Sequence, residues 1–241
     1  MIRACIFDLD GTTLYTLESI ARAGNRMLEA MGFSPRPLEE YRFYCGEGAD
    51  MLVERVLKKV DGYSRAAWEE GCRLNRRFLA EAPMYGVRPY DGMEKALATL
   101  KDQGIRLAVF TNKPDKAAGV AIKAAFGQDL FDLVQGDSGR YPLKPDPAGA
   151  LAISRHFGLS PEECLYFGDS ATDMKTARAA GMIPVGCLWG YRTREELTES
   201  RAAFLIGAPE EIPGLVDRLN DSFSRAEEEE KNPGAAGSEK A

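Results

Sequence analysis

The residues best suited to chemistry lie in the first twelve positions of the chain. Asp8 and Asp10 are two carboxylates separated by one residue; Gly11 and Thr12 follow them, and the apolar run 4–7 precedes them. A buried strand that ends in a turn would present both carboxylates at its carboxyl end. This pairing suits a carboxylate nucleophile with a second carboxylate that transfers protons.

Polar residues also follow two later apolar runs. Thr111 and Asn112 come directly after one run, and Asp169 and Asp173 follow another. Ligands of open α/β sheets bind outside the carboxyl ends of the strands, so we expect these side chains to converge with Asp8 on one site. Asp169 and Asp173 are four residues apart at the start of a predicted helix, and both can therefore point to the same ion.

Lys144 lies in the segment Pro142-Leu143-Lys144-Pro145-Asp146-Pro147, where prolines stiffen the loop before a predicted helix. A lysine held in this way supplies a fixed positive charge. Each of these residues taken alone is more common as a turn residue, a helix cap or a solvated charge. Their occurrence together, in this order, is what points to a catalytic site.

The ordered set resembles the haloacid dehalogenase superfamily in all four of its motifs. The motifs are Asp8-x-Asp10-Gly11-Thr12, Thr111-Asn112, Lys144-Pro145 and Gly168-Asp169-x-x-x-Asp173. The resemblance extends over the whole chain up to residue 220. Within the superfamily, Gly46-Glu47-Gly48-Ala49-Asp50, the apolar helix pattern of residues 52–57 and Lys113 are most similar to the phosphoglycolate phosphatase branch.

The resemblance implies a Mg²⁺-dependent phosphatase. A phosphate ester is anionic and would repel a carboxylate nucleophile, so Mg²⁺ bound by Asp8 and Asp169, together with Lys144, would supply the opposite charge. Asp8 would attack phosphorus to give an aspartyl phosphate. Asp10 would protonate the departing oxygen and then activate the water that cleaves the intermediate, a contribution of about 10²–10⁴ in rate.

The remaining site residues would support these steps. Thr111 and Asn112 would donate hydrogen bonds to the phosphoryl oxygens, and Gly11 and Thr12 belong to the same predicted substrate-binding set. Asp173 would orient either the metal-bound waters or Lys144. By the resemblance, Asp10 also gives the metal its backbone carbonyl. The predicted metal set is therefore Asp8, Asp10, Asp169 and Asp173.

Several substrates fit this chemistry. The leading hypothesis is hydrolysis of a small phosphomonoester, with 2-phosphoglycolate as the first candidate. A phosphosugar mutase of the β-phosphoglucomutase type, a pyrophosphatase or nucleotidase of the same superfamily, and a non-catalytic phosphate-binding protein are the alternatives. Asp10 weighs against a true haloacid dehalogenase, because expelling halide needs no proton donor. Arg42, Glu47 and Arg55 are candidates for contacts to the leaving group.

Short apolar runs define the elements that must position these residues. Continuous runs at 2–8, 105–110, 164–168 and 183–188, with a fifth at 204–206, predict buried parallel strands separated by helices. The fold class is therefore α/β, with a doubly wound, Rossmann-like parallel sheet.

A helical block without a convincing strand separates the first strand from Asp91, and helices are predicted at 49–60 and 64–81. We predict a catalytic core of residues 1–14 and 88–220 with an inserted helical cap of residues 15–87. Residues 221–241 predict a disordered acidic tail. Thr13 and Tyr15 depart from the usual Leu and Asp of the branch at the entrance to the cap.

Composition narrows the class of protein. The chain has 241 residues, a net charge of -6 and five scattered cysteines, so it can bury a full core and shows no disulfide framework or zinc motif. The acidic balance argues against nucleic acid as a partner, and no apolar run approaches the ~20 residues that span a bilayer. We expect a cytoplasmic enzyme, a monomer or homodimer, with a small-molecule substrate.

Overall fold

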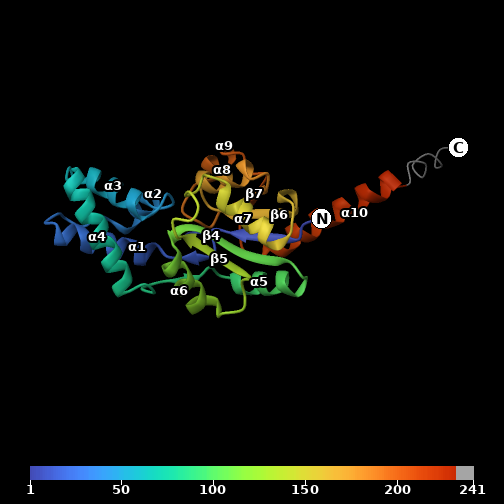
Figure 1. Cartoon of the computed structure of the whole chain (residues 1–241), viewed down its shortest axis with the longest axis horizontal. Coiled ribbons are helices and arrows are strands. Elements are labelled where there is room, and N and C mark those ends of the chain that lie inside the picture. Colours follow the sequence, from blue (N-terminus) through green and yellow to red (C-terminus); the bar gives the residue numbers. More distant parts are fainter. Residues whose placement is uncertain (232–241) are drawn as a thin grey trace.

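The computed structural model describes residues 1–231, which contain a six-stranded parallel sheet (Figure 1). The strands are β1 (Ala4–Phe7), β4 (Arg106–Pro114), β5 (Leu133–Asp137), β6 (Cys164–Gly168), β7 (Ile183–Cys187) and β8 (Phe204–Ile206). Their spatial order is β5-β4-β1-β6-β7-β8. Numbered along the chain, this is the order 3-2-1-4-5-6 of a doubly wound sheet, so the predicted fold class is confirmed.

Helices cover both faces of the sheet, because alternate strand residues point to opposite sides. Phe7 and Phe167 stack with their ring centroids 4.7 Å apart on one face. That face is covered by α5 (Met93–Asp102), α6 (Asp115–Phe126) and the first part of α10 (Glu211–Lys231). The opposite face is covered by α7 (Ala148–Phe157) and α8 (Ala171–Ala179). The strands are therefore buried on both sides, which explains their continuous apolar runs.

Four helices between β2 and β3 enclose a second hydrophobic core, at the left of Figure 1. They are α1 (Leu17–Ala30), α2 (Leu38–Tyr44), α3 (Ala49–Lys59) and α4 (Arg65–Glu81). Ser64 caps α4 by accepting a hydrogen bond from the backbone N–H of Ala67 at 3.1 Å. The helices predicted at 49–60 and 64–81 are confirmed to within a residue at each end, whereas α2 was not predicted.

A short antiparallel ribbon connects these helices to the sheet. It pairs β2 (Leu14–Tyr15) with β3 (Arg88–Pro89), so the expectation that this block lacks strands was wrong. Two-residue strands carry too few side chains to show a periodicity. The Arg88 guanidinium lies 4.1 Å from the centroid of the Tyr15 ring, and Tyr90 meets the same ring edge-on at 6.3 Å. Tyr15, which departs from the family pattern, thus packs within the connection.

Two further expectations are corrected by the structure. Strand β5 was not predicted, because it lies at the sheet edge and carries Gln135, Gly136 and Asp137 instead of a continuous apolar run. Helix α10 continues to Lys231, so the first eleven residues of the predicted disordered tail are helical; residues 232–241 lie outside the described residues. Within residues 1–231, the structure shows no helix with the length and apolar character needed to cross a membrane.

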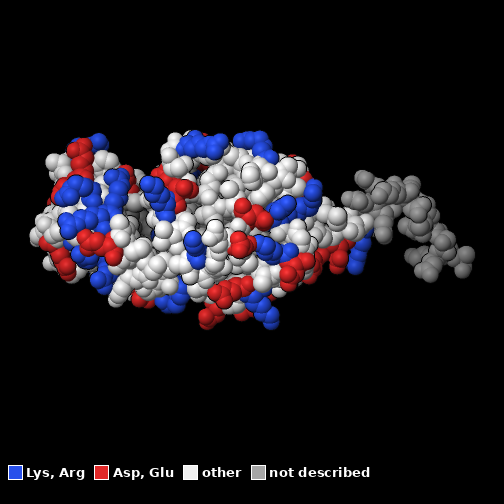
Figure 2. Space-filling model, turned by 60° about the horizontal axis from the view of Figure 1, so that its bottom comes forward, with Lys and Arg blue, Asp and Glu red and all other residues white. Residues whose placement is uncertain are grey.

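Surface charges of both signs are interspersed on the face drawn in Figure 2. Oppositely charged side chains also form pairs along the helices, such as Arg65 with Glu69 and Lys58 with Glu54. Exposed pairs of this kind contribute little to stability, about 0–1 kcal/mol each.

Candidate active site

The predicted catalytic residues lie where the strand order of the sheet reverses. Asp8 directly follows β1, and Asp169 directly follows its neighbour β6; Phe7 and Phe167 are paired in register just before them. The backbone N–H of Asp8 donates to the carbonyl oxygen of Phe167 at 2.9 Å. The reversal point of a doubly wound sheet is where this architecture leaves a crevice for ligands. The structure thus brings both carboxylates to the expected edge of the sheet.

Three carboxylates form a buried cluster at this point. One oxygen each from Asp8, Asp169 and Asp173 lies within 4.8 Å of the others, and each residue is at most 6% exposed. Burial, with smaller contributions from the neighbouring carboxylates, raises the pKa of Asp169 to about 8. Burial also raises the pKa of Asp8 to about 6, although Lys144 acts in the opposite direction. The protein therefore holds three carboxyl groups close together at a place where burial disfavours their charged forms.

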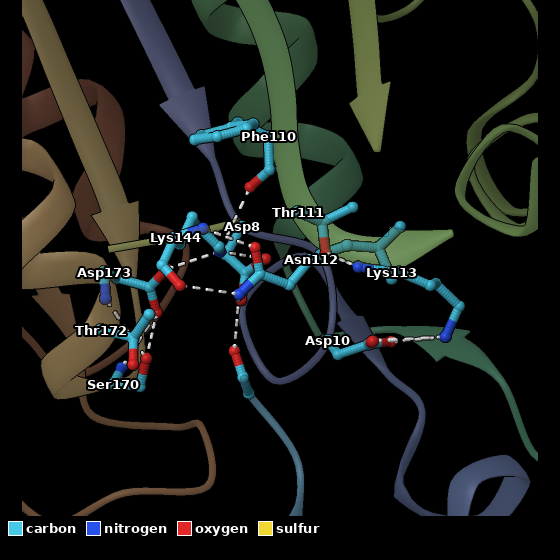
Figure 3. A network of polar contacts seen from close by, with 12 residues as sticks. Asp8, Asp10, Phe110, Thr111, Asn112, Lys113, Lys144, Ser170, Thr172 and Asp173 are labelled. Carbon is cyan, nitrogen blue, oxygen red and sulfur yellow. Dashed lines mark hydrogen bonds and ion pairs between the residues drawn. The ribbon is translucent and has the colours of Figure 1, made fainter. Parts of the chain in front are cut away.

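Lys144 supplies the counter-charge to two of these carboxylates (Figure 3). Its Nζ lies 2.8 Å from Asp8 Oδ1 and 2.7 Å from Asp173 Oδ1, and it donates to the carbonyl oxygen of Phe110 at 3.3 Å. Burial lowers the pKa of Lys144, but Asp173 and Asp8 outweigh it and hold this pKa well above the ordinary value. The two carboxylates thus favour the charged, ammonium form of Lys144.

Asp173 is positioned by the start of helix α8. Its Oδ2 accepts hydrogen bonds from both the hydroxyl (2.6 Å) and the backbone N–H (3.2 Å) of Ser170, the cap residue of the helix. Its other oxygen faces Lys144. Both oxygens of this carboxylate therefore have partners, and the geometry favours orientation of Lys144 over the alternative of orienting metal-bound waters.

Asp10 lies apart from the carboxylate cluster, on the other side of Figure 3. Its two oxygens are 3.0 and 3.3 Å from the Nζ of Lys113. Both side chains line the cavity of the site. The family resemblance implied that Asp10 contacts the metal through its backbone carbonyl. Its side chain is directed toward Lys113. Lys113 was not among the predicted site residues, although its position directly after Thr111 and Asn112 was a signal that could have identified it.

Thr111 and Asn112 lie within β4, just after its apolar residues, and both line the cavity. The Thr111 hydroxyl accepts a hydrogen bond from the backbone N–H of Lys113 at 3.2 Å, which leaves its own proton available to a ligand. The Asn112 amide accepts from the backbone N–H of Lys144 at 2.8 Å and donates to the carbonyl oxygens of Lys144 and Gly46, both at 3.2 Å. We expected Asn112 to donate hydrogen bonds to the phosphoryl oxygens. In the structure, its amide instead connects the Lys144 loop to Gly46 of the helical segment.

Gly11 and Thr12 form the turn beneath the carboxylates. Gly11 has a φ of +87°, and a Cβ at this position would lie 2.4 Å from Asp169 Oδ2. Only glycine therefore fits beside this carboxylate. The Thr12 side chain is fully buried, and its backbone carbonyl accepts a hydrogen bond from the indole N–H of Trp189 at 2.9 Å. The structure thus places these two residues under the site as supports of its backbone.

The cavity extends from the carboxylates into the helical segment. Its lining comprises Asp8, Asp10, Ile20, Cys45, Gly46, Gly48, Ala49, Leu52, Asn75, Leu79, Thr111, Asn112, Lys113 and Pro114. The three predicted leaving-group residues are absent from this lining. Arg42 Nε donates to the carbonyl oxygen of Tyr191 at 2.9 Å, and Arg55 pairs with Glu47. The sequence reasoning missed Asn75 and Leu79, which look like ordinary positions of an amphipathic helix.

The carboxylate cluster fits a hard divalent cation such as Mg²⁺. Asp8 Oδ1 is buried and has no hydrogen-bond partner in the described residues, since its contact with Lys144 lies outside hydrogen-bond geometry. Carboxylate oxygens are the protein ligands that Mg²⁺ prefers. A cation held by Asp8 and Asp169 would also favour the charged forms of these two carboxylates, whose pKa values burial raises. These two residues are therefore the ones that would hold the metal.

Comparison with known proteins identifies the family. Residues 2–181 match the haloacid dehalogenase-like hydrolase family. The chain belongs to that family. It is 33% identical over 233 residues to a phosphoglycolate phosphatase of Neisseria meningitidis, which covers 94% of this chain and 97% of that protein. A phosphoglycolate phosphatase of Pseudomonas putida is 32% identical over 219 residues, 89% of this chain and 80% of that protein.

A solved structure supports the same assignment. The crystal structure of a predicted phosphoglycolate phosphatase from Haemophilus somnus has a TM-score of 0.84 and 27% sequence identity, covering 89% of this chain and 98% of that one. The resemblance first seen in four short motifs is therefore confirmed over most of the chain. As a haloacid dehalogenase-like hydrolase, the chain is an enzyme.

Proposed function

We propose that this hydrolase cleaves a small phosphomonoester, with 2-phosphoglycolate as substrate, through an aspartyl-phosphate intermediate. One observation carries the proposal: a buried carboxylate, Asp8, contacts a buried ammonium, Lys144, while Asp10 lines the same cavity beside Lys113. A nucleophile next to a fixed positive charge and a separate proton-transfer group is what phosphoryl transfer to a carboxylate requires. The names of the relatives point to the substrate.

Asp8 is the proposed nucleophile. It lies at the end of the central strand, and the contact of its Oδ1 with Lys144 at 2.8 Å fixes the direction of the carboxylate. Attack on phosphorus forms the Asp8–phosphorus bond and breaks the bond to the leaving oxygen. This divides one hydrolysis into two displacements. Asp8 and Asp169 would hold Mg²⁺, which would supply positive charge that offsets the repulsion between the phosphoryl oxygens and the nucleophile.

Asp10 is the proposed general acid and base. In its protonated form it donates a proton to the departing oxygen, and the resulting carboxylate then takes a proton from the water that attacks the aspartyl phosphate. Its partner Lys113, 3.0 Å away, stabilises the carboxylate between the two steps. The two steps return Asp10 to its original protonation state, so the cycle balances.

Three further residues support the phosphoryl group. The Thr111 hydroxyl, which is free to donate a proton, and the ammonium of Lys144 would stabilise the negative charge that develops on the phosphoryl oxygens. Asn112 acts by positioning Lys144, through the hydrogen bond from the Lys144 backbone N–H.

The division into a core of residues 1–14 and 88–220 and a cap of residues 15–87 is part of the proposal. The cytoplasmic location and the oligomeric state stay predictions.

Release of inorganic phosphate from a panel of substrates tests this function. The panel contains 2-phosphoglycolate, pyrophosphate, nucleoside monophosphates and sugar phosphates, each with and without Mg²⁺. Asp8→Asn serves as the control, because it preserves the shape of the side chain and removes the nucleophilic charge. We expect metal-dependent release that is fastest with 2-phosphoglycolate and absent in the variant.

Other outcomes contradict particular parts of the proposal. Full activity of the Asp8→Asn variant would exclude the covalent mechanism. Fastest release from another member of the panel would keep the mechanism and reject 2-phosphoglycolate as the substrate. Isomerisation of a sugar phosphate without net phosphate release would reject the phosphatase in favour of a mutase.

A further inference from the structure

Asn75 is a buried polar residue of helix α4 that the proposed mechanism does not use. It is 2% exposed, and its side-chain Oδ1 is buried without a hydrogen-bond partner in the described residues. It lines the cavity together with Leu79, one helical turn further along. Residues at i and i+4 share a helix face, so this part of α4 is directed toward the site.

Two other asparagines of the chain show how unusual this arrangement is. Asn112 uses its amide fully, with Lys144 and Gly46 as partners. Asn25, in the same helical segment as Asn75, accepts from the backbone N–H of Arg36 at 2.7 Å and donates to its carbonyl oxygen at 2.9 Å. Most buried polar atoms of proteins have such partners, and one without a partner calls for a specific explanation. For Asn75, the cavity that it lines supplies one.

The chemistry of the cavity wall indicates what this amide would contact. The charged residues of the lining, Asp8, Asp10 and Lys113, all belong to the strands and loops of the sheet. The helical segment contributes uncharged residues: Ile20, Cys45, Gly46, Gly48, Ala49, Leu52, Asn75 and Leu79. On that side, Asn75 is therefore the side chain with strong hydrogen-bonding groups in an otherwise apolar wall.

We infer that Asn75 is a specificity-determining residue that hydrogen-bonds the polar end of the leaving group. The inference rests on the proposed function: the phosphoryl group occupies the charged floor of the cavity, and the leaving group must then lie against the wall formed by the helices. For 2-phosphoglycolate, the polar end is a carboxylate, to which the amide Nδ2 donates. Because an amide can turn over to present either Oδ1 or Nδ2, Asn75 suits this role without a change of the helix.

Two substrates of the same shape test this inference. Isobutyl phosphate replaces the carboxylate oxygens of 2-phosphoglycolate by methyl groups, and Asn75→Leu replaces the amide by an apolar side chain of similar size. A hydrogen bond to a charged group corresponds to about a 10- to 100-fold change in kcat/KM. We expect Asn75→Leu to lower kcat/KM for 2-phosphoglycolate by this factor and to change that for isobutyl phosphate far less. An unchanged ratio between the two substrates would overturn the inference.

Thermal unfolding distinguishes recognition from a structural role. The matched control is Asn25→Leu, which removes an amide whose hydrogen bonds are all within the protein. We expect Asn25→Leu to lower Tm, and Asn75→Leu to leave Tm unchanged or raise it, because an unpaired buried amide destabilises the free protein. A fall in Tm for Asn75→Leu, with parallel losses for both substrates, would show that Asn75 only supports the fold.

Binding to the inactive enzyme separates this inference from the proposed function. If the wild-type protein shows no preference for 2-phosphoglycolate, the proposed substrate fails on that observation alone. The role of Asn75 is then decided in the Asp8→Asn background, by titration with the best panel substrate and with inorganic phosphate, which has no leaving group. Asn75→Leu must weaken binding of the substrate about 10-fold or more and leave that of phosphate unchanged. Equal effects on both ligands would overturn it.

Discussion

Replacing Lys144 by Met tests how much of the fold depends on the charge arrangement of the site. The substitution preserves most of the side-chain stem and removes the ammonium, which leaves Asp8 and Asp173 buried without their counter-charge. Removing one partner of a buried ion pair costs about 3–5 kcal/mol of unfolding free energy. For a protein of this size, 1 kcal/mol lowers Tm by roughly 2–4 °C, so we expect a fall of roughly 6–20 °C.

The chain offers a matched control and a rescue. Lys113→Met also removes a lysine from the cavity, but this side chain and that of its partner Asp10 are 13% and 19% exposed, so water can solvate the remaining carboxylate. Its Tm should fall by less than about 4 °C. In the double variant Lys144→Met/Asp173→Asn, an amide replaces one of the two uncompensated carboxylates and still accepts from Ser170, so part of the lost stability should return.

Thermal and urea unfolding of protein treated with a chelator measure these differences without a contribution from bound metal. Phosphate release should be lost in both Lys144 variants, because the rescue restores stability and not the charge that faces the phosphoryl group. A Tm for Lys144→Met equal to that of Lys113→Met would show that the buried carboxylates Asp8 and Asp173 do not need the Lys144 charge for stability. A double variant no more stable than Lys144→Met would contradict the expected rescue, since Asp173 would then not depend on Lys144.

Three further predictions concern the backbone, the metal and a hydrogen bond to a residue of the cavity wall. Gly11→Ala should lower kcat about 100-fold, because the new Cβ would lie 2.4 Å from Asp169 Oδ2; steady-state kinetics measure it, and wild-type kcat would contradict it. Chelation with EDTA should abolish phosphate release and added Mg²⁺ should restore it, whereas release that persists in EDTA would exclude a metal requirement. Arg192→Met removes the hydrogen bond to the carbonyl oxygen of Cys45, which lines the cavity, and should lower kcat/KM by about 2- to 10-fold in steady-state kinetics. An unchanged kcat/KM would show that this hydrogen bond does not contribute to activity.

Much of the fold could be predicted because its core strands are buried on both faces. Runs such as residues 164–168 are continuously apolar, and the predicted site residue Asp169 directly follows this one. Strand β5 escaped prediction because an edge strand needs no such run, and Gln135 and Asp137 interrupt it. The β2–β3 ribbon was missed because two residues carry no period. Local patterns thus reveal elements that are buried, and they fail where pairing with a distant segment decides the structure.

The site shows the same division between local signal and tertiary contact. Asp8 and Asp169 were predicted because they follow strand ends, Thr111 because it follows the apolar run of β4, and Lys144 because it lies in a proline-stiffened loop. The structure brings them together. The partners of their side chains could not be predicted in this way. That Asn112 is engaged by the Lys144 backbone depends on a contact across 32 residues of sequence. Sequence spacing gives no account of such contacts.

The β2–β3 ribbon has a consequence for how this architecture can vary. Leu14 pairs with Pro89 and Tyr15 with Arg88. The chain therefore leaves the six-stranded sheet and returns toward it on two adjacent strands of the ribbon, which lie about 4.8 Å apart. The four helices are thus an elaborated hairpin loop. Their length and composition can change without altering the spacing of the two connections, and hence without moving the strand that carries Asp8. Under the proposed mechanism, a new leaving group could be accommodated by rebuilding the four helices while Asp8 keeps its place at the end of β1.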